Sequence, residues 1–244
     1  MAEATNLVLV PGLLCTKALW APQLAALGDI AEMTVADHTR HDSMAAIAES
    51  ILAVAPERFA LAGLSMGGFI SFEIVRQAPQ RVTKLALLDT SARPDLPERR
   101  ELRLARNELA RREGAGAVQD ELMPALVHKD RLADKAFVDT VRQMAVDTGA
   151  EALQRQHAAL MARPDSRPLL AGIRCPTLVI VGREDALTPP ELAQEIASGI
   201  AGAKLEIIPD CGHLATMEQP AAVNRAMRAW LTGGAASGSQ PSRA

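Results

Sequence analysis

The sequence is poor in aromatic residues and in cysteine, and it has no long apolar run. Aromatic side chains make up 2% of the 244 residues, and tyrosine is absent. The three cysteines, Cys15, Cys175 and Cys211, are an odd number without a Cys-x-x-Cys pair. This excludes a disulfide framework or a cysteine zinc site and is typical of reduced thiols. No run approaches the roughly 20 apolar residues of a membrane span, so we expect a soluble protein with no membrane partner.

The charge of the chain also excludes a class of partner. The formal net charge is -3, and such a balance does not indicate binding to nucleic acid. Residues 1–14 contain an apolar core but no basic region before it, and Pro11-Gly12 interrupts it. We therefore expect a strand and a turn there instead of a signal peptide, and a cytoplasmic protein. The hydrophobic fraction of 48% is enough for one large α/β domain.

Short apolar runs alternate with helical patterns along most of the chain. The runs end at turn residues or polar loops, as strands buried on both faces of a sheet do. These runs are residues 7–10, 33–36, 59–64, 85–88, 176–182 and 205–208. Helical patterns fit residues 20–27, 42–52, 69–75, 191–200 and 220–231. The alternation predicts an α/β fold with a doubly wound, mostly parallel sheet of about six strands.

The alternation stops between residues 91 and 168. This stretch has amphipathic segments at about 97–109, 117–127, 135–146 and 151–161 and no β-rich run. We interpret it as a helical cap inserted into one discontinuous core domain, residues 1–90 and 169–232. Charged residues of the first segment are interpreted as a solvated face with i,i+4 ion pairs. They are Arg99, Arg100, Glu101, Arg103, Arg106 and Glu108. Residues 233–244, rich in Gly, Ser and Ala, are expected to be a flexible tail.

One apolar run leads into a Gly-x-Ser-x-Gly sequence. Residues 59–62 are followed by Gly63-Leu64-Ser65-Met66-Gly67, and a helical pattern begins at Phe69. Strand, sharp turn and helix are the context of a nucleophile elbow, in which a strained serine presents its hydroxyl above the sheet edge. The glycines lack a Cβ, so strand and helix can pass close together. The motif is short, and a tightly packed turn without chemistry is the alternative to a catalytic Ser65.

Polar residues follow the other predicted strands. The residues after successive strands include Gly12-Leu13, Ser65, Asp89, Asp185 and His213. Reacting groups of doubly wound sheets gather at the carboxyl ends of the strands. A nucleophile, two acids and a histidine therefore map to one edge, in the chain order Ser, Asp, His. Their joint occurrence favours a catalytic Ser65.

In these motifs the chain resembles the α/β-hydrolase fold superfamily, and within it a small serine hydrolase or esterase with a helical cap. The elbow at 63–68, the acid loop at 182–189 and the histidine loop at 211–213 carry the resemblance, which spans about residues 6–231 apart from the variable cap. It implies a triad in which Ser65 is the nucleophile, His213 the base and then the acid, and Asp185 the carboxylate that orients His213. Asp89 is the rival acid, because some members place the acid after that earlier strand. The fuller motif favours Asp185, with Asp89 as a loop-capping residue.

The resemblance also implies an oxyanion hole made of two backbone N–H groups. Met66, at the start of the elbow helix, supplies one, and the loop after the first strand supplies the other, from Leu13 or, as the near alternative, Leu14. The family often has His-Gly in that loop, whereas this chain has Pro11-Gly12, so any side-chain role of that histidine is absent. Only one strand precedes the first helix, so the two leading strands common in the family are not expected.

The remaining histidines are weaker candidates for chemistry. His38 and His41 lie in a polar loop and are expected at the surface. His128 and His157 lie in the insertion, where a solvated or packed role is favoured over contact with a substrate. No spacing of His, Asp or Cys resembles a metal site, and nucleotide-binding glycine patterns are absent. We therefore expect neither a metal nor another cofactor.

The leading hypothesis is hydrolysis of a carboxylic ester of a small or medium-sized molecule through an acyl-Ser65 intermediate. A lactonase, a thioesterase, a carbon–carbon bond hydrolase or a lyase would use the same triad. A non-catalytic ligand-binding member of the fold is the alternative from another class. With few aromatics, and methionines at 66, 123, 144 and 161, we expect an aliphatic, adaptable pocket wall, although these methionines also fit a helix core. The sequence does not define the substrate or the oligomeric state.

Overall fold

A computed structural model describes residues 5–233 of the chain, and Gly233 is the only residue of the predicted tail among them. Residues 234–244 of that tail lie outside the described residues. Within the described range, one sheet has the strand order β2-β1-β3-β4-β5-β6, and every neighbouring pair is parallel. The strands are β1 (Thr5–Val10), β2 (Ala31–Val35), β3 (Phe59–Leu64), β4 (Val82–Leu88), β5 (Thr177–Gly182) and β6 (Lys204–Ile208). The predicted α/β fold and the six-stranded parallel sheet are confirmed.

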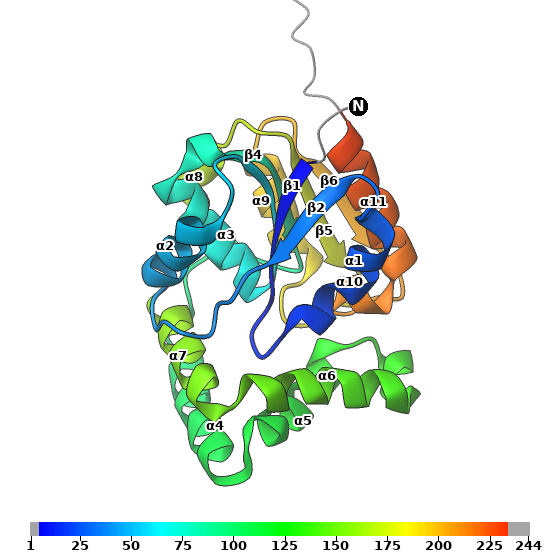
Figure 1. Cartoon of the computed structure of the whole chain (residues 1–244). Helices are drawn as coiled ribbons and strands as arrows, with labels where there is room; N and C mark the ends of the chain where they lie inside the picture. The colour runs from blue at the N-terminus through cyan, green and yellow to red at the C-terminus, as the bar shows by residue number, and fades with distance from the viewer. Residues whose placement is uncertain (1–4, 234–244) are drawn as a thin grey trace, which may run out of the picture.

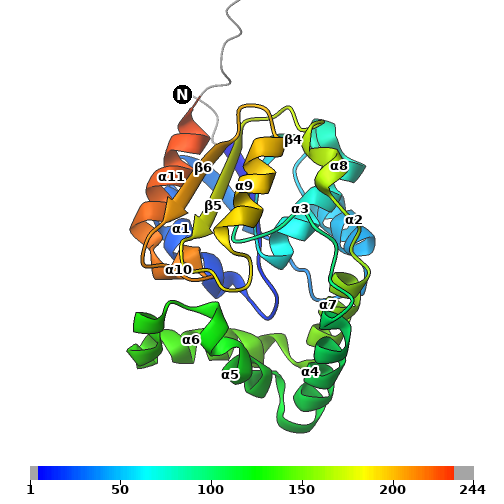
Figure 2. The same cartoon turned by 180° about the vertical axis from the view of Figure 1, so that it is seen from behind.

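Helices cover both faces of the sheet (Figure 1). Successive side chains of a strand point to opposite faces, so Leu7 and Leu9 of β1 belong to one apolar cluster, and Val8 and Val10 belong to the other. α1 (Ala21–Leu27) and α11 (Pro220–Thr232) pack into the first cluster. α2 (Met44–Val54), α3 (Met66–Gln77) and α9 (Pro190–Gly199) pack into the second. The same layers are seen from behind in Figure 2.

Local sequence signals explain where several helices begin. The side chain of Ser43 caps α2 by accepting a hydrogen bond from the N–H of Ala46. A proline stands in the first turn of α1, α9 and α11, where its missing N–H costs nothing. The remaining short helices are η1 (Lys17–Trp20), η2 (Pro79–Arg81), η3 (Lys129–Ala133), α8 (Arg167–Leu170) and α10 (Ala215–Glu218).

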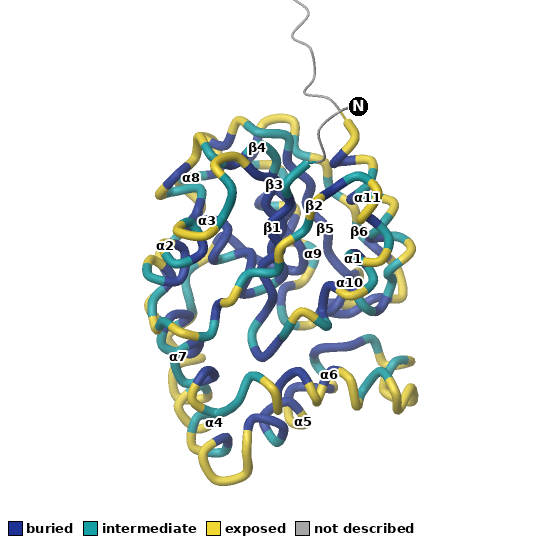
Figure 3. Tube along the Cα trace, viewed as in Figure 1, coloured by how far each residue is buried: buried dark blue, intermediate teal, exposed yellow. Residues whose placement is uncertain are grey.

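Four helices between β4 and β5 form the insertion that the sequence predicts. They are α4 (Arg99–Glu113), α5 (Ala115–Leu126), α6 (Lys135–Thr148) and α7 (Ala150–Met161). These green helices of Figure 1 lie beyond the carboxyl ends of the strands and cover that edge. In Figure 3 much of the surface of these helices is exposed, whereas the strands above them in the view are mostly buried. Treating the insertion as a cap domain distinct from the core stays a prediction.

The described residues contain no helix that is both long enough and apolar enough to cross a membrane. The edge of the sheet that faces the insertion is where the polar residues predicted for chemistry meet.

Candidate active site

Ser65 lies in a tight turn between β3 and α3. Its backbone has φ 54° and ψ -113°, a conformation that a residue with a side chain rarely adopts. The Ser65 N–H donates to the carbonyl of Leu88 at 2.9 Å, and the Thr90 hydroxyl donates to the Ser65 carbonyl at 2.8 Å. These two bonds from the neighbouring strand hold the strained turn in place.

The glycines on either side of Ser65 are required by close backbone packing. A Cβ on Gly63 would lie 2.2 Å from the carbonyl oxygen of Gly67, and a Cβ on Gly67 would lie 2.1 Å from that of Val10. Both distances are far inside van der Waals contact. The interpretation of Gly63 to Gly67 as a strand-turn-helix elbow therefore agrees with the local geometry.

Ser65, His213 and Asp185 form one hydrogen-bonded chain. The Ser65 Oγ lies 2.7 Å from His213 Nε2, and the His213 Nδ1–H donates to Asp185 Oδ2 at 2.8 Å. The hydroxyl of Thr188 donates to the same Oδ2 at 2.7 Å, and the N–H groups of Leu187 and Thr188 donate to Oδ1 at 2.9 Å. The carboxylate is thus fixed from several directions, and it holds the imidazole with Nε2 toward Ser65. Such an arrangement can remove the hydroxyl proton and return it to a leaving group.

The ionisation of the pair follows from its surroundings. Burial disfavours the imidazolium of His213, but the carboxylates of Asp185, Asp89 and Glu218 outweigh it and raise its pKa. Burial would raise the pKa of Asp185, yet the charge of His213 and the hydrogen bonds from His213 and Thr188 lower it. The pair therefore favours a charged His213 beside an ionised Asp185, the state that proton removal from Ser65 generates.

Asp89, the rival acid, has a different position. Its side chain is fully buried, Oδ1 accepts from the N–H of Gly182 at 2.9 Å, and Oδ2 accepts from the N–H of Ala215 at 3.1 Å. Burial and the nearby Asp185 raise the pKa of Asp89 well above its usual range. Among the described residues, the carboxyl of Asp89 makes no hydrogen bond to His213. It ties β5 to the start of α10, as the loop-capping interpretation expects.

A further buried carboxylate, Glu218 of α10, holds the histidine loop and was missed by the sequence analysis. Its Oε1 accepts from the N–H of Leu214 at 3.1 Å, and its Oε2 accepts from the N–H groups of Gly212 at 3.1 Å and His128 at 2.7 Å. The N–H of His213 donates to the carbonyl of Leu126 at 2.8 Å. The loop is therefore fixed both by the core and by the end of α5. A single Glu in a short helix gives no sequence signal for this role.

The loop after β1 is also held from a distance. The N–H of Leu14, a residue with φ 57°, donates to Gln156 Oε1 of α7 at 3.2 Å. His38 Nε2 donates to the carbonyl of Gly12 at 2.9 Å, and burial lowers the pKa of His38, so that the ring is neutral. The amide nitrogen of Gln156 lies 3.1 Å from His38 Nε2. Because Leu14 already has an acceptor, Leu13 is the better candidate for the second oxyanion donor.

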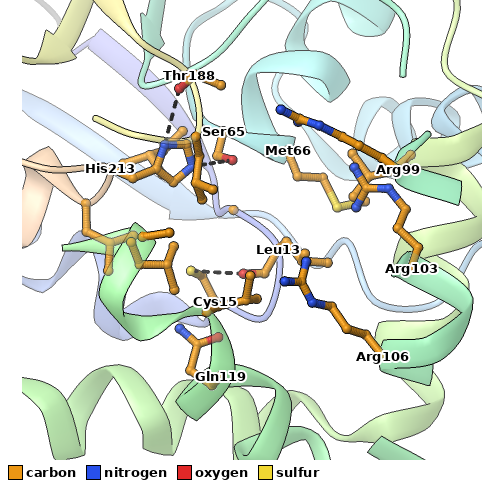
Figure 4. A pocket seen from close by; sticks show the side chains of 18 of the residues that line it. Leu13, Cys15, Ser65, Met66, Arg99, Arg103, Arg106, Gln119, Thr188 and His213 are labelled. Carbon is orange, nitrogen blue, oxygen red and sulfur yellow. Dashed lines mark hydrogen bonds between the residues drawn. The ribbon is translucent and has the colours of Figure 1, made fainter. Parts of the chain in front are cut away.

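A cavity of about 300 Å³ opens between the sheet edge and the inserted helices. Ser65, His213, Leu13 and Met66 lie on its core side, and Figure 4 shows their side chains around it. Apolar side chains form much of the wall: Leu64, Phe69, Leu102, Leu122, Ala125, Leu126, Leu160, Leu187 and Leu214. Among residues 5–233, no group of three or more His, Cys, Asp or Glu side chains has the arrangement of a metal site.

Comparison with known proteins decides the family. Residues 7–226 match the model of the Alpha/beta hydrolase family. This range includes most of the chain and reaches all six strands. The chain belongs to this family. It is a hydrolase with the α/β-hydrolase fold that the sequence predicts.

Several relatives of this hydrolase have known structures or curated descriptions. An esterase from Thermogutta terrifontis, solved with malate bound, is 33% identical, with a TM-score of 0.85 over 94% of this chain and 90% of the other. An enol-lactonase from Burkholderia xenovorans LB400 is 28% identical, with a TM-score of 0.86 over 95% and 93%. A protein of Rhizobium rhizogenes, RutD, provisionally described as a carbamate hydrolase, is 27% identical over 94% and 93%.

The structure corrects three expectations about the surroundings of the site. His38 is not at the surface but 2% exposed, beneath the loop after β1. Arg103 and Arg106 are half-buried and line the cavity of this hydrolase, and their ion pairs with Asp95 and Glu121 are not i,i+4 pairs, so the expected solvated face is wrong for them. Arg99 is exposed, as that expectation has it, but it also lines the cavity. The cavity wall is therefore not only aliphatic. Of the four methionines considered, Met66 lines the cavity, whereas Met123 and Met144 are buried in the apolar cluster.

The other histidines keep roles in packing. His157 is buried, and its Nδ1 lies 2.6 Å from the side-chain oxygen of Asn107. His128 accepts a hydrogen bond from the N–H of Asp130 through Nδ1. Neither lines the cavity beside Ser65.

Proposed function

We propose that this hydrolase cleaves carboxylic esters of small or medium-sized molecules through an acyl-Ser65 intermediate. The observation that carries the proposal is the continuous hydrogen-bonded chain from Ser65 Oγ through His213 to Asp185, opening into a cavity of about 300 Å³. Such a volume lies at the small end of ligand pockets. The similar esterase supports an ester as the bond attacked.

The reaction begins when His213 Nε2 takes the proton of Ser65 and the oxygen attacks the ester carbonyl carbon. The oxyanion that forms accepts hydrogen bonds from the N–H groups of Met66 and Leu13. Neither group has an acceptor among the described residues, so both are available. One such donor is worth roughly 3–4 kcal/mol in the transition state. The protonated His213 then donates its proton to the leaving alkoxide, and Asp185 stabilises the imidazolium meanwhile.

Deacylation uses the same groups in reverse roles. His213 removes a proton from water, the hydroxide attacks the acyl carbonyl, and Ser65 leaves with the proton returned by His213. The acid product then departs from the cavity. Apart from the ester and this water molecule, the steps use only groups of the chain itself.

A lactone is the second candidate substrate. A cyclic ester presents the same carbonyl to Ser65, and its leaving alkoxide stays attached to the acyl group. The similarity to an enol-lactonase over 95% of the chain favours this candidate. Hydrolysis rates of a lactone and of its open-chain ester, measured side by side, distinguish the two.

Replacement of the nucleophile tests the proposal. Ser65→Ala removes the attacking oxygen while both backbone hydrogen bonds of the residue remain. We expect turnover of a 4-nitrophenyl ester panel to fall by about 10⁴-fold or more with an unchanged Tm. Ser50→Ala is the matched control, because its hydroxyl only bonds the carbonyl of Ile47 within α2. A Ser65→Ala protein with the turnover of the unmodified chain would refute the proposal.

Turnover also separates an enzyme from a binding protein of this fold. An enzyme releases many equivalents of 4-nitrophenol per protein chain at a steady rate. A ligand-binding member would give a single stoichiometric burst. We expect sustained multiple turnover.

A further inference from the structure

Three arginines of α4 face the same cavity as Ser65. Arg99, Arg103 and Arg106 are spaced i, i+4 and i+7, which places them on one side of the helix. In Figure 4 they extend into the cavity from the side opposite His213. The cavity therefore has a reacting end on the sheet and a cationic end on the insertion.

The cations at this end are only partly neutralised by the protein. Arg103 donates from Nε and Nη2 to Asp95, and Arg163 donates from Nη1 to the same carboxylate. Arg106 donates from Nε and Nη2 to Glu121. Two carboxylates thus serve three guanidinium groups. Arg99 has no hydrogen bond or ion pair to any of residues 5–233, so two positive charges are left over.

The ionisation of neighbouring groups reflects the same excess of positive charge. Burial, together with the charges of Arg103 and Arg106, lowers the pKa of His157 to about 3. Burial also lowers the pKa of Arg163 to about 10, where Arg103 and Arg99 oppose the favourable effect of Asp95. The two positive charges that Asp95 and Glu121 leave uncompensated at this wall would be neutralised by an anionic ligand.

An amide without a hydrogen-bond partner among the described residues lines the same cavity. Gln119 of α5 is 2% exposed, and its side chain makes no hydrogen bond with any described residue. Figure 4 shows its amide directed toward the loop that holds Leu13 and Cys15. The amide atoms of Gln119 remain open to the cavity, so a polar ligand can form hydrogen bonds with them there.

We propose that the arginine wall binds a carboxylate carried by the substrate, away from the carbonyl that Ser65 attacks. The substrates are then monoesters of small dicarboxylic acids, or lactones that bear a free carboxylate. The proposal rests on the proposed ester hydrolysis. The free guanidinium of Arg99 offers the planar fork that matches a carboxylate. Within residues 5–233, the Nη1 groups of Arg103 and Arg106 have no hydrogen-bond partner and so add donors, and Gln119 adds an amide.

Two esters of similar size test the charge preference. The 4-nitrophenyl monoester of glutaric acid carries a distal carboxylate, whereas 4-nitrophenyl pentanoate has a methyl group there. We expect kcat/KM to be at least about 10-fold higher for the acidic ester. Arg99→Gln should lower kcat/KM for the acidic ester by about 10- to 100-fold, mainly through KM, and change the neutral ester less than twofold.

Arg100→Gln is the matched control, because Arg100 is exposed and charged like Arg99 but does not line the cavity. It should leave both substrates unchanged. Equal kcat/KM values for the two esters, or equal losses in the Arg99 and Arg100 variants, would overturn the carboxylate site while leaving ester hydrolysis intact. A phosphate-bearing ester that is preferred over the glutarate ester would also overturn it.

A direct binding measurement tests the carboxylate site separately from the proposed ester hydrolysis. Calorimetry with free glutarate requires no turnover, and we expect it to bind the unmodified chain and Ser65→Ala but not Arg99→Gln. If glutarate binds in this pattern and neither ester is hydrolysed, the site stands and the proposed function fails. If glutarate does not bind any of the three proteins, the carboxylate site is refuted.

Discussion

Residues outside the proposed triad hold each of its three members, Ser65, His213 and Asp185, in place. Ser65 is fixed through its backbone by Leu88 and Thr90, and Asp185 accepts from the N–H groups of Leu187 and Thr188. Such supporting bonds keep reacting atoms at fixed distances before a substrate arrives, so little reorganisation is needed. At this scale, the proposed chemistry depends on which carboxylate serves His213.

Asp185→Asn should lower turnover by about three to four orders of magnitude. The amide cannot stabilise the imidazolium, and it favours the wrong tautomer of His213. KM should change little, because Asp185 lies behind the histidine and outside the cavity wall. Steady-state kinetics on a 4-nitrophenyl ester give both values.

Asp89→Asn is the matched comparison, since it changes the rival carboxyl in the same way. Turnover should stay within a few-fold of the unmodified chain. One of the N–H groups of Gly182 and Ala215 would lose its acceptor, so the Tm should fall. A large loss of turnover in Asp89→Asn together with a small one in Asp185→Asn would reassign the acid.

The pH dependence follows from the raised pKa of His213. Only the neutral imidazole can accept the Ser65 proton, so kcat/KM should fall as the pH decreases through that pKa in the free enzyme. The midpoint should lie above about 6.5, the usual value for histidine. Asp185→Asn should move the midpoint of its residual activity downward, because it removes the largest charge that raises the pKa. A midpoint below 6 in the unmodified chain would contradict this account.

At the scale of elements, the loop after β1 depends on a helix of the insertion. Gln156 of α7 accepts from the N–H of Leu14 and leaves the neighbouring N–H of Leu13 free for a substrate. The positive φ of Leu14 costs roughly 1–2 kcal/mol, so the loop needs such support. Insertion and core are thereby connected at the point where the oxyanion would bind.

Gln156→Ala should therefore impair catalysis without removing any group that contacts the substrate. We expect kcat to fall about 10-fold with a small change in KM, as the oxyanion donor is less well fixed, and the free energy of unfolding to fall by about 1–3 kcal/mol. Gln143→Ala, on the exposed side of α6, is the control. It should change neither kcat nor the free energy of unfolding. A fall in stability with unchanged kcat would show that Gln156 only supports the fold.

Elements with a local signal could be predicted from the sequence. Each strand is a short apolar run closed by a turn residue, and parallel strands bring Ser65, Asp185 and His213 to one edge whatever lies between them. Gln156 could not be found, because its contact with Leu14 joins residues 142 positions apart. Glu218 could not be found either, because one Glu in a short helix gives no signal for contacts with Gly212 and Leu214, and its contact with His128 is 90 positions away. His38 was misplaced because a polar loop indicates the surface, whereas the Gly12 carbonyl holds the ring inside.

At the scale of the whole molecule, the insertion supplies the far wall of the cavity. An amphipathic helix such as α4 has the same pattern whether its charged side meets water or a cavity. Only the packing of α4 above the sheet edge shows that Arg99, Arg103 and Arg106 face Ser65. The core therefore sets the proposed reaction, while the insertion would select the molecule on which it acts.

The most direct test of the central claim is the position at which a covalent inhibitor attaches. A fluorophosphonate reacts with a serine that an imidazole activates, and peptide mass spectrometry locates the adduct. The account predicts one adduct per chain, on Ser65, formed in step with the loss of esterase activity and abolished by His213→Ala. An adduct on another residue, or full activity after Ser65 is modified, would contradict it.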